Sequence, residues 1–186
     1  MVKKLFENKW IDLYETKRGF VFAQRRTINS TACLLFKQDG KDYKFLLRYQ
    51  PLPELKITEK NKLTWNKLYP CCVTGSIEAN ETPTDNAIKE ILEETNYVTT
   101  KNNIKASSIS VASTQMNESV FNFVVDITNA KQVYKKTGDG SIFENISRNR
   151  WVSHKKLKEI LTTNKFVYLS SLSSAYVLFT KVILHK

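Results

Sequence analysis

Residues 75–97 read GSIEANETPTDNAIKEILEETNY, and they contain the most strongly marked helix of the chain. Thr82 suits the N-cap position because its hydroxyl can accept a hydrogen bond from a first-turn amide, and Pro83 fits the first helical position. Asn96 follows the last turn, where asparagine tolerates the left-handed conformation of a C-terminal cap. The stretch therefore predicts a loop followed by a helix from Pro83 to Thr95.

Three glutamates of this helix, Glu90, Glu93 and Glu94, are spaced so that they share one helical face. Like charges at these spacings repel by roughly a few tenths of a kcal/mol, and the C-terminal half of a helix disfavours negative charge. A divalent cation would reverse this cost, and carboxylate oxygens suit Mg²⁺ or Mn²⁺. Taken alone, the three residues are compatible with a solvated acidic face as well as with a metal site.

The surrounding residues resemble the Nudix box, G-x5-E-x7-R-E-U-x-E-E-x-G-U, in which U is a bulky aliphatic residue. The matching positions are Gly75, Glu81, Glu90, Ile91, Glu93 and Glu94. Lys89 replaces the arginine of the box and keeps its charge, although it loses the bidentate fork. Asn96 replaces the second glycine, and asparagine is the next-best residue for a left-handed conformation. Tyr97 takes the final bulky position.

The resemblance implies a fold and an activity. The fold is of the α+β class, a Nudix-type α/β/α sandwich with a mixed central sheet and a loop-helix-loop catalytic motif. The activity is that of a metal-dependent pyrophosphohydrolase, which cleaves the diphosphate of a nucleoside diphosphate linked to another moiety. Mg²⁺ is the implied cofactor, with Mn²⁺ as a substitute, and the metal would neutralise the pyrophosphate and activate the attacking water.

Residue roles carry over from the box by position. They are those of metal ligands (Glu90, Glu94 and the backbone carbonyl of Thr74), catalytic carboxylates (Glu93 and Glu94) and structural residues of the motif (Gly75, Glu81 and Lys89). In this scheme Glu81 pairs with the charge at Lys89 and braces the loop.

Flanking segments resemble the ADP-ribose pyrophosphatase branch of the superfamily, whose substrates are ADP-ribose and related nucleotide sugars. Residues 20–26 (FVFAQRR), 45–51 (FLLRYQP) and 138–144 (GDGSIFE) carry this resemblance, and they imply substrate contacts by Arg25, Arg48 and Gln50. Gln50 stands where the branch has an arginine. Cys71 stands where the branch has a carboxylate that contacts substrate or metal.

Glu118 ends the segment ASTQMNE (residues 112–118), which resembles the branch's S-P-G-x-x-x-E loop. The glutamate of that loop is the proposed catalytic base in some members, so Glu118 is the candidate base here. The alternative is an ordinary acid in a surface loop, because the proline and glycine of the loop are missing.

The 186 residues carry 29 Lys and Arg against 18 Asp and Glu, a formal net charge of +11. Such a surplus attracts polyanions, and a phosphorylated small molecule is the favoured partner. Two alternatives stay open: a Nudix enzyme that acts on RNA 5′ ends or oxidised nucleoside triphosphates, so that nucleic acid is a less favoured partner, and a nucleotide-binding module without catalysis.

The length predicts a single domain, 1–186, in which residues 1–28 form an N-terminal strand extension. The family resemblance suggests that this extension serves a homodimer. Three cysteines, two of them adjacent, do not suit a disulfide framework, and we expect buried thiols. Without an apolar leader or an apolar run of about 18 residues, the sequence predicts a cytoplasmic protein with no membrane partner.

Hydrophobic patterning outside the box predicts further elements. Strands are expected at 10–14, 20–23, 31–36, 43–49, 109–112, 119–127 and 143–151, helices at 155–161 and 170–184, and a loop or insertion at 56–67.

Overall fold

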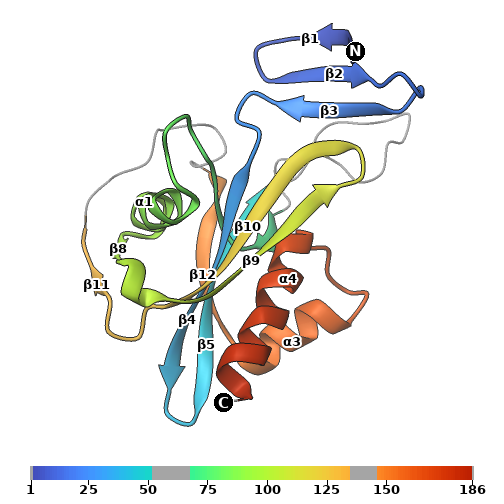
Figure 1. Ribbon diagram of the computed structural model, residues 1–186. Helices are drawn as coiled ribbons and strands as arrows, with labels where there is room; N and C mark the ends of the chain where they lie inside the picture. Colours follow the sequence, from blue (N-terminus) through green and yellow to red (C-terminus); the bar gives the residue numbers. More distant parts are fainter. Residues whose placement is uncertain (1, 52–67, 135–145, 186) are drawn as a thin grey trace.

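Two long strands, β4 (Ser30–Asp39) and β5 (Asp42–Pro51), form a hairpin at the centre of the molecule (Figure 1). Gly40 lies in the turn with φ +64°, a conformation that glycine adopts without strain. The structure is a computed structural model that describes residues 2–51, 68–134 and 146–185. The expected insertion at 56–67 lies outside the described residues.

A mixed sheet surrounds this hairpin in the order β1-β2-β3-β10-β4-β5-β12, with β6 on β5, β7 on β4 and β9 on β10. Strand β10 runs parallel to β3 and β4, whereas the other pairs of this sheet are antiparallel. The remaining strands are β1 (Lys3–Glu7), β2 (Ile11–Glu15), β3 (Val21–Arg25), β6 (Leu68–Cys71), β7 (Val73–Ser76), β9 (Ile104–Ser113), β10 (Met116–Asp126), β12 (Arg148–Ser153) and the separate pair β8 (Tyr97–Val98) and β11 (Lys131–Gln132).

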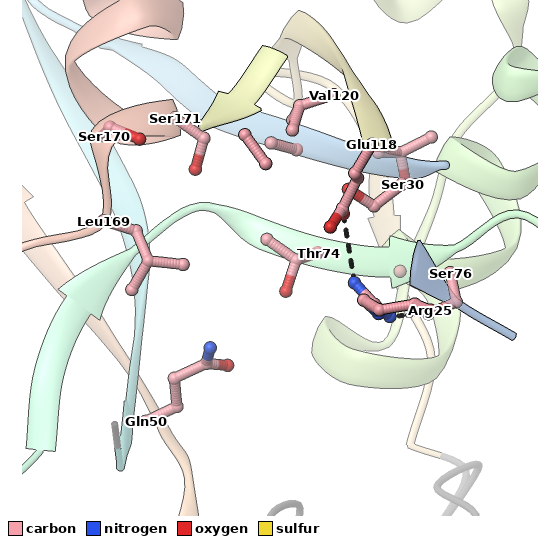
Figure 2. A pocket seen from close by; sticks show the side chains of 14 residues that line it. Arg25, Ser30, Gln50, Thr74, Ser76, Glu118, Val120, Leu169, Ser170 and Ser171 are labelled. Carbon is pink, nitrogen blue, oxygen red and sulfur yellow. Dashed lines mark hydrogen bonds and ion pairs between the residues drawn. The ribbon is translucent and has the colours of Figure 1, made fainter. Parts of the chain in front are cut away.

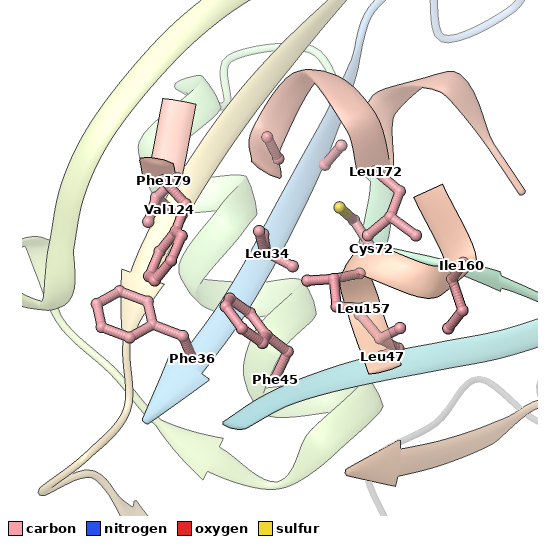
Figure 3. Packing of buried hydrophobic residues seen from close by; sticks show 12 residues of the cluster. Leu34, Phe36, Phe45, Leu47, Cys72, Val124, Leu157, Ile160, Leu172 and Phe179 are labelled. Atoms are coloured by element: carbon pink, nitrogen blue, oxygen red, sulfur yellow. The ribbon is translucent and has the colours of Figure 1, made fainter. Parts of the chain in front are cut away.

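Helices cover both faces of the sheet: α1 (Pro83–Thr95) on one face, and α3 (His154–Thr162) and α4 (Ser170–Phe179) on the other (Figure 1). Strand residues alternate between the two cores, as the pleat requires. Cys33 and Leu35 pack with Ile91 of α1, while Leu34 and Phe36 pack with Phe179 of α4 (Figure 3). This α+β sandwich is the fold class that the sequence predicts.

Helix α1 has the predicted bounds and the predicted caps. The Thr82 hydroxyl accepts a hydrogen bond from the Asp85 amide at 3.1 Å, and Pro83 takes the first helical position. Asn96 adopts φ 62° and donates its amide to the Leu92 carbonyl at 2.9 Å. Local capping chemistry therefore fixes where this helix begins and ends.

Other boundaries differ from the sequence predictions. Strand β10 begins at Met116 rather than Ser119, because a tight turn joins it directly to β9. The described part of the strand expected at 143–151 is β12, which starts at Arg148 and runs to Ser153; residues 143–145 lie outside the described range. The helix expected at 170–184 ends at Phe179 and continues as a π-helical turn over Thr180–Leu184.

The N-terminal strands β1, β2 and β3 form a meander that extends the sheet beyond the helices (Figure 1). Arg26 ties it together, since its guanidinium lies 2.8 Å from Glu7 and 3.3 Å from Asp12. The use of this extension in a dimer stays a prediction. All three cysteines are buried and free, as expected. No helix within the described ranges is long and apolar enough to cross a membrane.

Candidate functional site

A cavity of about 490 Å³ opens where β4, β7 and β10 meet the start of α4 (Figure 2). Its lining brings together residues that are far apart in the sequence. Among those singled out from the sequence, the cavity contains Arg25, Gln50, Thr74, Gly75 and Glu118. The lining does not include Arg48 or the three glutamates of α1.

Glu118 is a buried carboxylate at this cavity, with only 7% of its side chain exposed. Its Oε1 lies 3.0 Å from Nη1 of Arg25 and accepts a hydrogen bond from the Ser30 hydroxyl at 2.6 Å. Arg25 also donates from Nη2 to the Ser76 hydroxyl. The carboxylate and the guanidinium thus hold each other at the cavity wall (Figure 2).

The expectation that Glu118 lies in a loop is wrong. The residue is the third of strand β10, which begins directly after the turn at Thr114 and Gln115. A strand fixes the direction of the side chain more tightly than a loop does. The strand, together with the contacts to Arg25 and Ser30, therefore fixes how the Glu118 carboxylate is oriented at the cavity.

Glu90 lies on the other side of β7, against the backbone of Gly75. A Cβ built on Gly75 would overlap the Glu90 side chain, so only glycine lets the carboxylate come this close. Burial, together with the neighbouring charge of Glu93, raises the pKa of Glu90 from 4.5 to about 7. A partly buried carboxyl beside a like charge is a common feature of functional sites.

The ion pair that the family pattern implies between Lys89 and Glu81 is present, with Nζ 2.8 Å from Oε1. The pair and the hydrogen bonds to Glu81 lower the pKa of this carboxyl. Asn86 adds a brace that the sequence analysis missed. Its buried amide donates to Glu81 at 2.8 Å and to the Ser76 carbonyl at 2.9 Å, and its oxygen accepts from Thr31 at 2.6 Å. The loop before α1 is therefore bonded to both the helix and the sheet.

Glu94 lies at the C-terminal end of α1 and faces β5 rather than the cavity. Its Oε1 is 3.0 Å from Nε of Arg48, and the two side chains are 10% and 6% exposed. Arg48 was expected to contact substrate. The structure places its guanidinium in an ion pair with Glu94 and outside the cavity lining, and a contact with substrate stays a prediction.

Sequence reasoning missed Ser30, Ser76 and Asn86, the polar residues that connect the predicted ones. The position of Asn86 could have indicated its role, because a polar residue one helical turn before Glu90 and next to the apolar face of α1 is placed to face the sheet. Ser30 and Ser76 stand at strand ends, where no pattern separates a network residue from an ordinary serine.

The donor chemistry of the α1 face suits Mg²⁺ or Mn²⁺ in part. Glu90 and Glu93 repel each other, and a divalent cation with a preference for oxygen would offset that repulsion. Across residues 2–51, 68–134 and 146–185, however, no three His, Cys, Asp or Glu side chains are grouped closely enough to hold a metal ion. Glu90 and Glu93 fit the cation by type, while the Glu94 carboxylate faces Arg48.

Comparisons with known proteins support the fold. No protein-family model matches the sequence, and a search of curated proteins finds no match either. Among solved structures, one described as the crystal structure of an ADP compounds hydrolase superposes with a TM-score of 0.63 at 13% sequence identity. The superposition covers 100% of this chain and 92% of that chain. At this identity the similarity establishes the fold alone, and it agrees with the sandwich predicted from residues 75–97.

Proposed function

We propose that this chain is a metal-dependent pyrophosphohydrolase of ADP-linked compounds, with ADP-ribose as the first substrate to test. Cleavage of ADP-ribose by water at the diphosphate would yield AMP and ribose 5-phosphate. Three findings support the proposal: the box-like pattern of residues 75–97, a fold shared with an ADP compounds hydrolase, and a cavity of suitable size beside the box.

The observation that supports the proposal most is the arrangement around β7. Gly75 belongs to the cavity lining and is also the residue against which Glu90 packs. A diphosphate in the cavity would therefore be separated from the α1 carboxylates by the backbone of one glycine. A volume of about 490 Å³ falls within the range of roughly 300–1,000 Å³ typical of small-molecule sites.

Two residues of the cavity would act on the substrate directly. The Arg25 guanidinium is 36% exposed and can donate to phosphate oxygens in addition to its bonds to Glu118 and Ser76. Glu118 would accept the proton of the attacking water, with Ser30 and Arg25 fixing its orientation. Glu90 and Glu93 would hold a divalent cation, which supplies charge neutralisation and an activated water when bound.

A substrate panel with Mg²⁺ and Mn²⁺ tests the proposal, with products separated by chromatography. The panel contains ADP-ribose, other nucleotide sugars, an RNA with a 5′-triphosphate end and an oxidised nucleoside triphosphate. We expect metal-dependent release of AMP from ADP-ribose by the wild-type chain. Glu90→Gln should abolish this turnover, and Glu15→Gln, a change on the N-terminal meander, should leave it intact.

A panel without turnover of any diphosphate compound would contradict the proposal. Turnover confined to the RNA or to the oxidised triphosphate would keep the reaction class and replace the substrate. The net charge of +11 is the observation that keeps these two substrates in the panel.

A second candidate function is nucleotide binding without catalysis. The ion pair between Arg48 and Glu94 favours it, because it engages one of the box carboxylates inside the protein. Calorimetry separates the two candidates: a binding module would take up ADP-ribose with or without a divalent cation and release it unchanged.

A further inference from the structure

The ion pair between Arg48 and Glu94 is the most enclosed pair of opposite charges in the described part of the chain, with both side chains at or below 10% exposure. Arginine stays protonated at every pH at which the protein folds, so the positive charge is permanent. Burial of one such charge is costly unless an opposite charge accompanies it. The partner that the structure supplies is a glutamate of the box.

A second contact fixes the same helix residue to the sheet. The side-chain amide of Asn149 on β12 donates to the backbone carbonyl of Glu94 at 2.6 Å. Asn149 and Arg48 are directly opposite each other in the β5–β12 ladder. Two neighbouring strands therefore hold Glu94, one at its carboxylate and one at its carbonyl. A cation near the C-terminus of a helix also interacts favourably with the helix dipole.

We propose that Arg48 supplies the counter-charge of Glu94, so that divalent cations bind this site through Glu90 and only weakly through Glu94. This inference rests on the proposed metal-dependent function. Arg48 is then a positioning residue. At one end of the acidic face of α1 it neutralises Glu94, and at the other end it leaves Glu90 to bind a divalent cation. The end with Glu90 is the one next to Gly75 and the cavity.

Electrostatics gives the reason. A divalent cation on Glu94 would have to share the carboxylate with a guanidinium whose Nε is 3.0 Å away, and the two cations would repel each other in a buried environment. At Glu90 the balance is opposite, because Glu93, one helical turn away, adds a second negative charge. The adjacent Lys89 is paired with Glu81 at 2.8 Å. The same cation is therefore opposed at one end of the face and favoured at the other.

Mn²⁺ binding, followed by electron paramagnetic resonance, tests the inference without any substrate. In the wild-type background we expect Glu94→Gln to weaken Mn²⁺ binding by less than about threefold. Arg48→Gln should tighten binding by about tenfold, as expected for removal of one nearby positive charge. In the Arg48→Gln background, Glu94→Gln should then weaken binding by about tenfold, since Glu94 has become available.

Arg48→Lys and Arg18→Gln serve as controls. Lysine keeps the charge next to Glu94 and should leave Mn²⁺ affinity near the wild-type value. Arg18 lies in the turn between β2 and β3, so its loss changes the net charge without changing the site. Circular dichroism of each variant checks folding, and the Arg48→Gln/Glu94→Gln double variant avoids a buried unpaired charge.

The inference is overturned if Glu94→Gln alone weakens Mn²⁺ binding tenfold while Arg48→Gln leaves it unchanged or weaker. In that case the metal-dependent function survives, with Glu94 as a main ligand. If the wild-type chain binds no Mn²⁺ and Glu90→Gln changes nothing, the proposed function fails as well.

Discussion

The side chain of Glu90 occupies the space that a Cβ on Gly75 would need. Two residues of the stretch 75–97, one in β7 and one in α1, are thus in direct contact. The contact explains in physical terms why position 75 of this chain suits a glycine. The backbone conformation there does not require one; the close approach of the glutamate does.

Gly75→Ala should lower the free energy of unfolding by about 1–3 kcal/mol, because the new methyl group forces the Glu90 side chain out of its place. Urea unfolding measures the loss. In a Glu90→Ala background the same substitution should cost much less, since the obstructing side chain is gone. An equal cost in both backgrounds would mean that the strain arises elsewhere.

Asn86→Ala should destabilise the protein more than Lys89→Met. Asn86 is fully buried and makes three hydrogen bonds, so its loss leaves buried groups without partners, at a cost of about 2–3 kcal/mol. The Lys89 side chain is 34% exposed, and its pair with Glu81 should contribute about 1 kcal/mol or less. Thermal unfolding of the two variants checks the order, and the reverse order would contradict the role given to Asn86.

Stability should fall as the pH rises from about 5 to 8, and Glu90 should account for part of the fall. Its pKa is about 7 in the folded state against 4.5 ordinarily, so between these values the folded state binds more protons than the unfolded state. The stabilisation is therefore complete below pH 4.5 and lost as the pH passes 7. Because the carboxyl is only partly buried, we expect a contribution of about 1–2 kcal/mol.

Urea unfolding of Glu90→Gln and the wild type at pH 5 and pH 8 isolates this contribution. The glutamine variant should show the shallower fall by about 1–2 kcal/mol, because it has no proton to lose. Glu15→Gln, a substitution at the end of β2 and away from the cavity, should match the wild type. If the free energies of unfolding of Glu90→Gln and the wild type differed by the same amount at both pH values, the pH dependence would not arise from Glu90.

Glu118→Gln tests the proposed general base. Glutamine can still accept the hydrogen bond from Ser30, so the cavity should keep its shape. We expect kcat for ADP-ribose to fall by about 100-fold or more while KM changes little. Steady-state kinetics measures both constants. A rise in KM with kcat unchanged would assign Glu118 to substrate binding instead.

Much of the fold could be predicted from residues 75–97 because the information there is local. Capping by Thr82 and Asn96 sets the ends of α1, and glutamate spacing sets its acidic face. The pairing of Glu81 with Lys89 is also local, since only seven residues of loop and helix separate them. Such features depend on bonds between near neighbours and are read directly from the pattern.

The rest of the candidate site depends on contacts between distant residues, which one sequence does not specify. Arg25 meets Glu118 because β3 and β10 run side by side. Arg48 of β5 meets Glu94 because α1 packs on β4, which pairs with β5, and on β7, which pairs with β4. Hydrophobic alternation predicts that Arg48 belongs to a strand, but it does not say which helix covers its side chain. The burial of Arg48 and its pairing with Glu94 therefore could not be predicted from the sequence.

The pairing of Arg25 with Glu118 gives the N-terminal meander a place in the chemistry of the cavity. Arg25 ends β3, the last strand of the extension, while Glu118 belongs to the central sheet. The boundary between extension and core thus runs through an ion pair rather than through a linker. A chain without residues 1–28 would still contain the strands and helices of the sandwich, but the buried carboxylate of Glu118 at the cavity would have lost the guanidinium of Arg25.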